Sequence, residues 1–526
     1  MARSVAYFSM EVGVNPEIKT YSGGLGVLAG DTLKSAADLG LDFLGVTLLY
    51  RNGYFRQVLE DGFQHEEDQD WGFEEVLTDT GKTVEVEVKG DSVDLKIWKY
   101  TVEGERGEID ILFLDSGLDS NSEEAREYTS QLYGGGDEMR LCQEVVLGIG
   151  GVKAVEETGF RPDYFHMNEG HSALLTLEAD NCVFTTHTPV AAGHDSFRPE
   201  LVEKVLGDRA KQLELDGDLN MTELALKNSG FCNAVSEKHR KVSEKMFEDY
   251  SFEAVTNGIH CNTWASEHFS SLYDEELPLW REDSDRLFQA LKIEDSKVWE
   301  AKQGSREDLR KLVESKTGET MDENFTIGFA RRSTAYKRPT LLFKDIDSLK
   351  KLGEKYGGFN VVFGGKAHPD DTNGKELIQQ IVNYADMLEN VNVYFIEDYS
   401  IEEACKMVSG CDLWLNNPVR GQEASGTSGM KAALNATPQL SVLDGWWLEG
   451  HIEDVTGWSI GEDYVEGEDE DKVDSKSIYR KLDHILSMYQ NDRQQWLDVM
   501  KNCIALNAAY FNTERMLKEY MTKAYR

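Results

Sequence analysis

A chain of 526 residues is too long for one ordinary hydrophobic core, so we expect two or three domains. Hydrophobic residues make up 40% of the chain, which excludes a disordered or fibrous protein, and no apolar run reaches the roughly 20 residues needed to cross a bilayer. The 96 acidic residues outnumber the 55 basic ones and give a formal net charge of −41. This excess argues against nucleic acid or an anionic membrane as a partner, so an anionic ligand needs a local cluster of cations.

The cysteines and the N-terminus bear on where the protein works. The 7 cysteines are scattered, odd in number and never in a Cys-x-x-Cys pair, so we predict reduced core residues rather than a disulfide framework or a zinc site. The first ten residues predict an early strand and lack the longer apolar core of a secretion signal. We therefore expect a cytoplasmic protein without a bound metal. A solvated surface and a salty cytoplasm would each account for the acidic excess.

Segments rich in β-branched and aromatic residues alternate with helix-length amphipathic segments, a pattern typical of parallel sheets covered by helices. We predict two Rossmann-like α/β lobes, residues 1–290 and 291–526. The charged region 282–302 would connect them, and the last helix could pack on the first lobe. Ligands in such sheets bind beyond the carboxyl ends of strands, so the polar loops there are candidate sites. The predicted strands are residues 41–50, 109–114, 164–168, 182–187, 325–330, 360–364 and 391–396.

The first candidate loop is rich in glycine and runs from Ser22 to Asp31, just before a predicted helix. Its Gly24 can present a bare backbone N–H to a phosphate or a sugar. A tight turn that lets the helix pack closely on the sheet explains the same glycines.

Two further polar loops follow strands in the first half of the chain. One contains Asn168-Glu169-Gly170-His171, and the other begins at His187. Loop residues in this position can bind a hydroxyl-rich ligand, although a single histidine is more often a structural residue. Asn257, in Asn257-Gly258-Ile259, allows two interpretations, a ligand loop or a simple turn.

A basic cluster follows the strand that ends at Ala330. Arg331, Arg332, Lys337 and Arg338 place four cations within eight residues of a very acidic chain, which indicates a local anion. A surface helix with solvated cations is the alternative. Polar loops also follow the next two predicted strands, and they are Gly364-Gly365-Lys366 and Glu397-Asp398-Tyr399.

The stretch Glu423-Ala424-Ser425-Gly426-Thr427-Ser428-Gly429-Met430-Lys431 combines small residues, hydroxyls and one lysine. We predict that Gly426 and Gly429 adopt backbone conformations closed to other residues and that a helix begins at Lys431. An anion would then meet a helix N-terminus, hydroxyl groups and an amine together, which predicts a phosphate site. A polar loop before a helix with a solvated lysine is the alternative.

Together these motifs resemble the α-glucan phosphorylase family, whose members act on glycogen, starch or maltodextrin. The resemblance runs from the Gly24 loop to Lys431 and covers most of the chain. The glycine loop alone also resembles starch synthases. The loop from Glu423 to Lys431, followed by Leu443-Asp444-Gly445, is highly specific for phosphorylases.

The resemblance implies a two-lobed glycosyltransferase fold with the active site in the cleft between the lobes. It implies pyridoxal phosphate held as an imine on Lys431, with a 5′-phosphate that exchanges a proton with inorganic phosphate. The terminal α-1,4-linked glucose would leave as glucose 1-phosphate with retained configuration. The implied partners are an α-1,4-glucan and inorganic phosphate. Whether the chain also forms a homo-oligomer is left open.

The resemblance also assigns roles to individual residues. Arg331 and Thr427 would contact the cofactor phosphate, with Tyr399 near the cofactor, while Arg332, Lys337 and the Gly24 N–H would hold substrate phosphate. His187, Asn257, Glu423 and the backbone of Ser425 and Gly426 would hold glucose. Of these, we expect His187, Arg332 and Lys337 to be the residues closest to the reaction.

This chain differs from the better-known family members in two respects. They have Gly-Asn where this chain has Ser428-Gly429, and they are longer, with an N-terminal elaboration that this chain largely lacks. Two other functions are compatible with parts of the pattern: a glucan synthase that uses a sugar nucleotide, and a glucan-binding protein without catalytic activity. Lys431 in its loop argues against both.

Overall fold

The computed structural model describes residues 3–526, which form two compact units. The first unit contains residues 3–55, 68–256 and 513–526, and the second contains residues 56–67 and 257–512. Each unit is built around a sheet with helices, so the predicted α/β class is confirmed. Among residues 3–526, no helix is both long and apolar enough to cross a membrane.

The first unit contains a nine-stranded sheet in the order β13-β12-β9-β8-β1-β2-β7-β6-β5. The pairs from β13 to β7 are parallel, and β6 pairs antiparallel with both β7 and β5. All four strands predicted for this half exist, whereas the long antiparallel β5–β6 hairpin was not predicted. The strands are β1 Val5–Ser9, β2 Phe43–Leu48, β5 Thr78–Val88, β6 Asp91–Glu103, β7 Glu108–Asp115, β8 Tyr164–Asn168, β9 Cys182–Thr186, β12 Ser229–Ala234 and β13 Glu253–Ala254.

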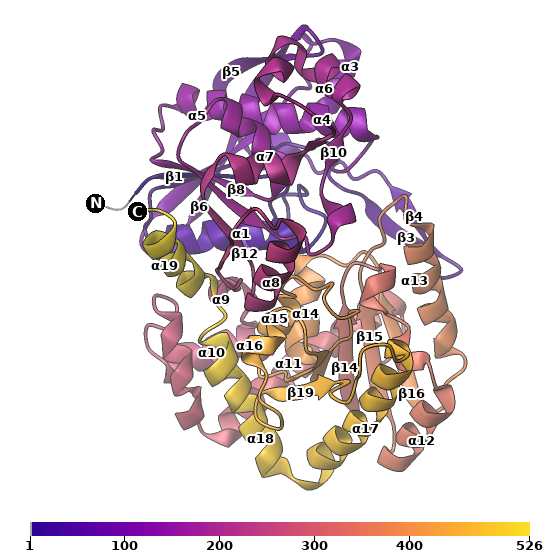
Figure 1. The fold of residues 1–526 in the computed structure, drawn as a ribbon. Coiled ribbons are helices and arrows are strands. Elements are labelled where there is room, and N and C mark those ends of the chain that lie inside the picture. Colours follow the sequence, from indigo (N-terminus) through magenta and orange to yellow (C-terminus); the bar gives the residue numbers. More distant parts are fainter. Residues whose placement is uncertain (1–2) are drawn as a thin grey trace. The chain divides into compact units, whose positions relative to one another are not determined.

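The C-terminal helix α19 (Thr513–Lys523) is part of the first unit, although the chain reaches it from the second. It lies beside α1 (Gly24–Asp38), and Figure 1 shows yellow α19 next to indigo α1. Tyr525 and Tyr520 pack on the buried ring of His166. The other helices of this unit are α2 Phe73–Val76, α3 Glu123–Arg126, α4 Asp137–Val145, α5 Gly151–Thr158, α6 Pro199–Leu206, α7 Met221–Lys227 and α8 Glu237–Met246. A small sheet pairs β10 Ser196–Phe197 with β11 Leu219–Asn220.

The second unit contains a six-stranded, entirely parallel sheet in the order β16-β15-β14-β17-β18-β19. After β14 the chain builds outward through β15 and β16, and then returns to the other side of β14 with β17. Every residue of β14 and β15 is buried, as expected for strands covered on both faces. The strands are β14 Phe325–Ala330, β15 Phe359–Gly364, β16 Val391–Ile396, β17 Leu413–Asn416, β18 Gln439–Val442 and β19 Gly457–Ile460.

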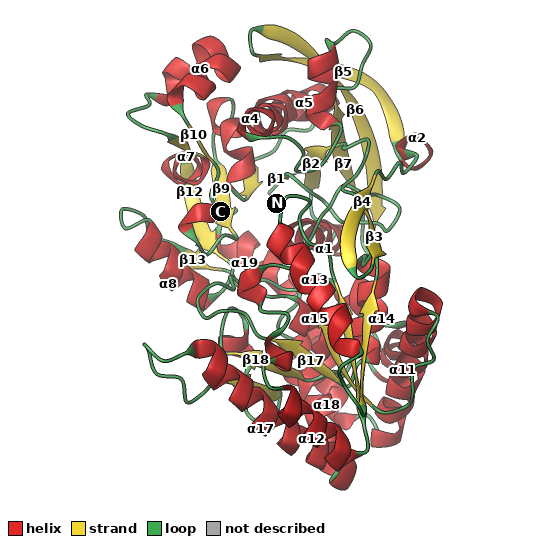
Figure 2. Cartoon of the chain, turned by 90° about the vertical axis from the view of Figure 1, so that its right-hand side faces the viewer, coloured by secondary structure: helices red, strands yellow, loops and turns green. Residues whose placement is uncertain are grey.

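A hairpin from early in the chain also belongs to the second unit. Its strands β3 (Arg56–Glu60) and β4 (Phe63–Glu67) lie beside α13 (Thr372–Ala385), as Figure 2 shows. Gln64 Oε1 accepts the Ala367 N–H at 2.8 Å, and Lys375 pairs with Glu66. The other helices of this unit are α9 Cys261–Trp264, α10 Glu267–Glu276, α11 Asp295–Thr317, α12 Ile346–Tyr356, α14 Ile401–Gly410, α15 Ser428–Leu434, α16 Trp447–Gly450, α17 Glu470–Asn491 and α18 Arg493–Asn502.

The two units divide between residues 256 and 257, whereas the predicted boundary lay between 290 and 291. The difference has a packing origin, since residues 257–290 bond to the second unit. Asn435 Nδ2 donates to the Trp264 carbonyl at 2.8 Å, and the Tyr273 hydroxyl donates to the Leu434 carbonyl at 2.5 Å. Within the predicted connector 282–302, α11 begins at Asp295 and buries Val298.

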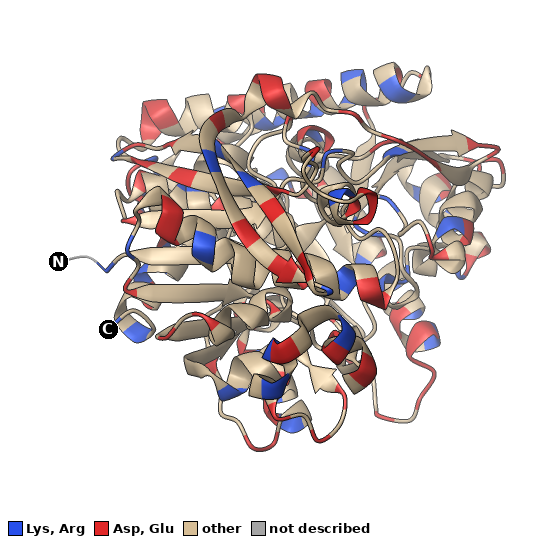
Figure 3. Ribbon diagram, turned by 90° about the horizontal axis from the view of Figure 1, so that it is seen from above, with Lys and Arg blue, Asp and Glu red and all other residues tan. Residues whose placement is uncertain are grey.

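Charged residues are spread over many elements. In Figure 3, acidic residues in red and basic residues in blue are interspersed along helices and strands rather than gathered in one segment. No single segment therefore accounts for the acidic excess. The cysteines of residues 3–526 form no disulfide with one another, and most are buried, which agrees with the predicted reduced core residues.

A buried lysine joins three parts of the second unit. Lys302 on α11 donates to the Ser409 carbonyl at 2.8 Å, the Cys411 carbonyl at 2.5 Å and the Thr437 hydroxyl at 2.5 Å. The first two groups lie at the end of α14, where carbonyls have no partner within the helix. Burial lowers the pKa of Lys302 to about 8, although the charge of Asp412 opposes this shift. Lys302 therefore supplies a donor to the Ser409 carbonyl and a second donor to the Cys411 carbonyl, which also accepts the Thr437 hydroxyl.

We expect Lys302→Met to lower the free energy of unfolding by about 1–3 kcal/mol, because the new side chain fills the space but removes the ammonium donor from these acceptors. Lys406→Met, at an exposed lysine that pairs with Glu402, should stay within about 0.5 kcal/mol of wild type. Urea unfolding followed by circular dichroism measures both. Because the folded pKa is depressed from 10.5 to about 8, wild-type stability should also rise with pH across that interval, and the variant should lack this rise. Equal stabilities of the two variants would contradict the assignment.

Candidate active site

The reversal of strand order in the second sheet lies between β14 and β17. In open parallel sheets, ligands bind at such a reversal, beyond the carboxyl ends of the strands. Arg331 directly follows β14, and Glu423 lies in the loop after β17. Arg331 Nη2 and Lys337 Nζ both contact Glu423 Oε2, the latter at 2.6 Å. The sheet therefore brings Glu423 to two cations that lie more than 80 positions earlier in the sequence.

The charge of Glu423 is held by these two cations. Burial raises the pKa of Glu423, but the charges of Arg331 and Lys337 outweigh it and lower the pKa to about 2. All three side chains are nearly buried, so the ion pairs are little screened by solvent. Glu423 is therefore ionised throughout the physiological pH range.

The Arg331 guanidinium has further N–H donors that do not contact Glu423. Its Nε and Nη1 atoms are buried and have no hydrogen-bond partner among residues 3–526, and the same holds for the Ser425 hydroxyl. Such groups each cost about 1–3 kcal/mol when they stay unsatisfied. A planar guanidinium matches the geometry of a phosphate, so these donors fit an anionic oxygen ligand.

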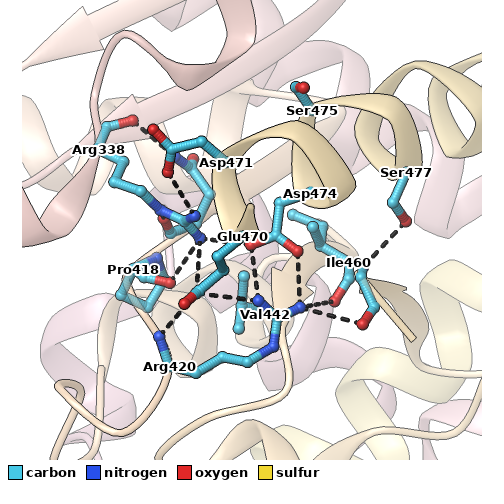
Figure 4. A network of polar contacts seen from close by, with 12 residues as sticks. Arg338, Pro418, Arg420, Val442, Ile460, Glu470, Asp471, Asp474, Ser475 and Ser477 are labelled. Carbon is cyan, nitrogen blue, oxygen red and sulfur yellow. Dashed lines mark hydrogen bonds and ion pairs between the residues drawn. The ribbon is translucent and has the colours of Figure 1, made fainter. Parts of the chain in front are cut away.

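The four cations of the predicted basic cluster have three different surroundings. Arg331 and Lys337 contact Glu423, and Arg332 is exposed. Arg338 belongs to a separate network, in which its guanidinium contacts Asp474 at 2.6 Å and the Pro418 carbonyl at 2.8 Å (Figure 4). The cluster is thus not a single anion site, because Arg338 is fully used by the fold.

Lys431 lies inside a helix rather than at its start. The predicted helix start at Lys431 is wrong, because α15 begins at Ser428 and Lys431 lies in its last turn. The side chain is 8% exposed, and its Nζ lies 3.7 Å from the centroid of the Trp264 ring. Trp264 was not predicted as a site residue, and nothing in the sequence near it signals this contact.

The two glycines of this loop serve different purposes. Gly426 has φ 85°, a left-handed conformation that favours glycine, as predicted. Gly429 is helical, and the prediction of a special conformation there is wrong. A Cβ at Gly429 would lie 1.5 Å from Gln439 Oε1, so this glycine permits close packing on β18. The Ser428 hydroxyl accepts the Trp414 Nε1–H at 3.0 Å, which also directs position 428 toward the sheet.

Tyr399 packs at the carboxyl end of β15. A Cβ at Gly364 would lie 2.8 Å from Tyr399 Cδ2, so the missing side chain makes room for the ring. The next residue, Gly365, has φ 130°, and a Cβ there would lie 2.0 Å from the Arg331 carbonyl. Tyr399 therefore borders Gly364, and Arg331 borders the neighbouring Gly365. Lys366 forms an ion pair with Asp398 at 2.6 Å, so its charge is compensated within the protein.

In the first unit, Gly24 is the first residue of the long helix α1. A Cβ at Gly23 or Gly24 would meet nothing within 4 Å, so packing does not explain these glycines. Gly26 is different, because a Cβ there would lie 2.7 Å from Tyr21 Cβ. The loop is anchored by Glu11, whose Oε2 accepts the Ser22 N–H at 2.5 Å. Close packing therefore explains Gly26, while the binding of a phosphate or sugar by the Gly24 N–H stays a prediction.

Glu169 organises the His187 loop. Its Oε2 accepts the His187 N–H at 2.7 Å and the Thr188 hydroxyl at 2.9 Å, while Oε1 accepts the Gly170 N–H at 3.0 Å. Glu169 has φ 81° and ψ 166°. This backbone conformation costs about 1–3 kcal/mol for a residue with a Cβ, and such strained residues are most frequent at functional sites. This strain supports a functional role for the loop.

His187 is neutral at physiological pH. Burial lowers its pKa to about 3, and neighbouring histidines add to this shift. Its Nε2 lies 2.6 Å from Asn168 Oδ1, which indicates the tautomer with a proton on Nε2. A neutral imidazole can accept or donate hydrogen bonds to hydroxyl groups but supplies no positive charge.

His171 and Asn257 have other surroundings. His171 Nε2 lies 3.5 Å from Asp195, which also pairs with Arg140 at 3.1 Å, and burial lowers the pKa of His171 to about 3. His171 is therefore part of a buried ion-pair cluster of the first unit. Asn257 is buried at the start of the second unit, just before α9.

These features define an α/β protein whose second unit gathers buried cations and a buried lysine at the reversal of a parallel sheet. A family model described as carbohydrate phosphorylase matches residues 13–106 and 194–457. The chain belongs to this family, and the predicted resemblance is confirmed.

Three relatives illustrate the similarity. The chain is 36% identical to a maltodextrin phosphorylase of Thermococcus litoralis, over 99% of this chain and 70% of the relative. It is 33% identical to a glycogen phosphorylase of Aquifex aeolicus, over 99% and 86% of the two chains. It is 36% identical to a glycogen phosphorylase of Mycobacterium tuberculosis, over 99% and 70%.

We expect Glu423→Gln to lower the free energy of unfolding by about 3–5 kcal/mol, because it leaves Arg331 and Lys337 buried without their counter-charge. The pKa of Glu423 is depressed in the folded protein, so its contribution is complete above about pH 4.5 and is lost as the pH falls toward 2. The destabilisation should therefore be constant between pH 5 and 8.

Urea unfolding at several pH values, with and without inorganic phosphate, measures this effect. Phosphate should stabilise the variant more than the wild type, because the anion compensates the two cations. Glu402→Gln, at an exposed carboxylate that pairs with Lys406, is the matched control and should change little. A Glu423→Gln variant as stable as wild type would contradict the proposed role of the ion pairs.

Proposed function

We propose that this protein is an α-glucan phosphorylase that contains pyridoxal phosphate. It would cleave the terminal α-1,4-glucosidic bond of glycogen, starch or maltodextrin with inorganic phosphate and release glucose 1-phosphate with retained configuration. The observation that carries this proposal is the combination of buried Lys431 with the unsatisfied Arg331 donors in a chain of the carbohydrate phosphorylase family. The names of its relatives, maltodextrin and glycogen phosphorylase, support the substrate class.

The residues present fit the cofactor. Lys431 supplies a primary amine in a nearly buried position beside the Trp264 ring, and an aromatic ring there can pack against a flat heterocycle. Arg331 supplies two buried donors for the cofactor phosphate, and Thr427 precedes the first residue of α15. Tyr399, at the carboxyl end of β15, would lie near the same group. When bound, the cofactor would supply a phosphate that exchanges a proton with substrate phosphate.

Positive charge would hold the substrate phosphate. Lys337 and exposed Arg332 are proposed as its ligands, together with the Gly24 N–H at the start of α1. Two phosphates repel each other strongly unless cations surround them, which accounts for arginine and lysine in so acidic a chain. The bound substrate phosphate would also place negative charge next to an oxocarbenium-like glucosyl group, where no carboxylate acts as nucleophile.

Hydrogen-bonding groups would hold the glucose. We assign this role to His187, Asn257, Glu423 and the backbone of Ser425 and Gly426. The low pKa of His187 supports a role as a neutral hydrogen-bonding partner rather than as an acid. Glu423 is ionised and would accept hydrogen bonds from sugar hydroxyls. The reduced cysteines support a cytoplasmic location.

We expect the purified protein to carry the absorbance of bound pyridoxal phosphate and to release glucose 1-phosphate from maltodextrin and phosphate. Lys431→Ala should contain no covalently bound cofactor and should lose activity by at least about 10³-fold, because the amine that retains the cofactor is gone. Lys406→Ala, at an exposed lysine of a neighbouring helix, should keep both properties.

Cofactor content and phosphorolysis of maltooligosaccharides are measured on the same samples. A native protein without cofactor, or a fully active Lys431→Ala variant, would refute the proposal. Transfer of glucose from ADP-glucose or UDP-glucose would instead favour a glucan synthase. Binding of glucan without turnover would favour a non-catalytic glucan-binding protein.

A further inference from the structure

The loop that carries Glu423 follows β17 and is held in two places. Its first part is anchored to α17 by an ion-pair network, which Figure 4 shows. Arg420 in this loop donates to Asp474 through Nη2 at 2.6 Å, and its backbone N–H donates to Glu470 at 3.0 Å. These contacts fix the loop up to Arg420. They do not reach Glu423 itself.

The part of the loop around Glu423 is held by a different carboxylate. Asp444 Oδ2 accepts the Gly421 N–H at 2.8 Å and the Glu423 N–H at 3.0 Å, and Oδ1 accepts the Gly445 N–H at 2.9 Å. Asp444 follows β18, the strand next to β17, and is 3% exposed. One buried carboxylate thus accepts three backbone N–H groups, two of them from the Glu423 loop.

The residues after Asp444 hold the loop on the other side of Glu423. The Trp446 N–H donates to the Ser425 carbonyl at 3.0 Å. Gly445 has φ 51°, and a Cβ there would lie 2.3 Å from the same carbonyl oxygen, so the two backbones are in close contact. Residues 444–446 therefore bond to the chain both before and after the Glu423 side chain, while Arg331 and Lys337 bind its carboxylate.

We propose that Asp444 is a positioning residue for the reaction: its ionised carboxylate fixes the backbone at Glu423 and so places the Glu423 carboxylate against Arg331 and Lys337. The catalytic consequence rests on the proposed phosphorylase function, whereas the structural part does not. Asp444 touches neither the buried cations nor, in the proposed reaction, the substrate. A displacement of about 1 Å in a group that orients substrate can lower a rate by about 100-fold.

Protonation controls this arrangement. An ionised carboxylate offers only acceptors, which suits three N–H donors, whereas a protonated one must donate its own hydrogen. Burial raises the pKa of Asp444 to about 6, the Glu423 and Gly445 N–H groups lower it, and the charge of Glu423 raises it further. Glu423 is itself neutralised by Arg331 and Lys337. As the pH falls through about 6, Asp444 takes up a proton and its hold on the loop weakens.

Ionisation of Asp444 has opposite effects on the stability of the whole protein and on the Glu423 loop: it lowers the free energy of unfolding but holds the loop in place. Because the folded pKa lies above the ordinary value of 3.8, ionising Asp444 costs folding free energy as the pH rises from about 4 to about 6. The protein thus accepts a less favourable buried charge in the pH range where the Glu423 loop is correctly held.

Asp444→Asn tests the proposal, because the amide keeps the size of the side chain but turns one acceptor into a donor. The first measurement is hydrogen exchange of the peptide that contains residues 419–425, which needs no activity. We expect at least a 10-fold loss of protection in Asp444→Asn, and in wild type a comparable loss, after correction for intrinsic rates, between pH 7 and pH 5. Unchanged exchange in both comparisons would overturn the proposal.

The second measurement is phosphorolysis of maltodextrin from pH 5 to pH 8. We expect Asp444→Asn to lower kcat/KM by roughly 30- to 100-fold at pH 7 and to lack the acidic limb that wild type shows near pH 6. Glu423→Gln removes the group being positioned, so Asp444→Asn in that background should add less than about 3-fold. Multiplicative effects of the two substitutions would overturn the positioning role.

Two controls separate the possible failures. Asp463→Asn, at an exposed surface carboxylate, should change neither exchange nor kinetics. If wild type shows no phosphorolysis but Asp444→Asn loses protection, the proposed function fails and the structural assignment stands. If Asp444→Asn does not fold, the wild-type exchange and kinetic profiles across pH 6 decide the matter without any variant.

Discussion

The contact of one buried carboxylate, Glu423, with two buried cations organises the second unit. A carboxylate or a guanidinium alone is very unfavourable in the interior, so Arg331, Lys337 and Glu423 are stable there only together. The reversal of strand order between β14 and β17 brings their loops to the same edge of the sheet. Around this contact lie the unsatisfied Arg331 donors, and nearby in the sequence lies the helix that holds Lys431.

The same rule recurs elsewhere in each unit: where a charge is buried, the backbone or a counter-charge satisfies it. Lys302 bonds to the carbonyls at the end of α14, and Asp474 bonds to Arg338 and Arg420. In the first unit, Glu169, whose own backbone is strained, holds the His187 loop. Strain and buried charge both lower stability, so their presence in the loops after strands is evidence that these loops serve more than folding.

Much of the fold could be predicted from the sequence, because buried parallel strands are continuous apolar runs that alternate with amphipathic helices. The strands that begin at Tyr164 and Phe325 have the bounds that the sequence predicted. The division between the units was harder to predict, since it depends on which sheet residues 257–290 and the 56–67 hairpin pack against. The helix start at Lys431 was missed because Ser428 and Gly429 are weak helix formers that packing on β17 and β18 overrides.

The sequence by itself determined the α/β class, the family and most of the candidate residues, because residue type and spacing carry strand periodicity and the loop motifs. Only the tertiary structure decided what each charged residue contacts. Four neighbouring cations from Arg331 to Arg338 have three different surroundings, and Asp444 holds a loop more than 20 residues away. The reason is physical: side chains pair through the alignment of parallel strands that are distant in the sequence, and burial then determines which charges must be compensated.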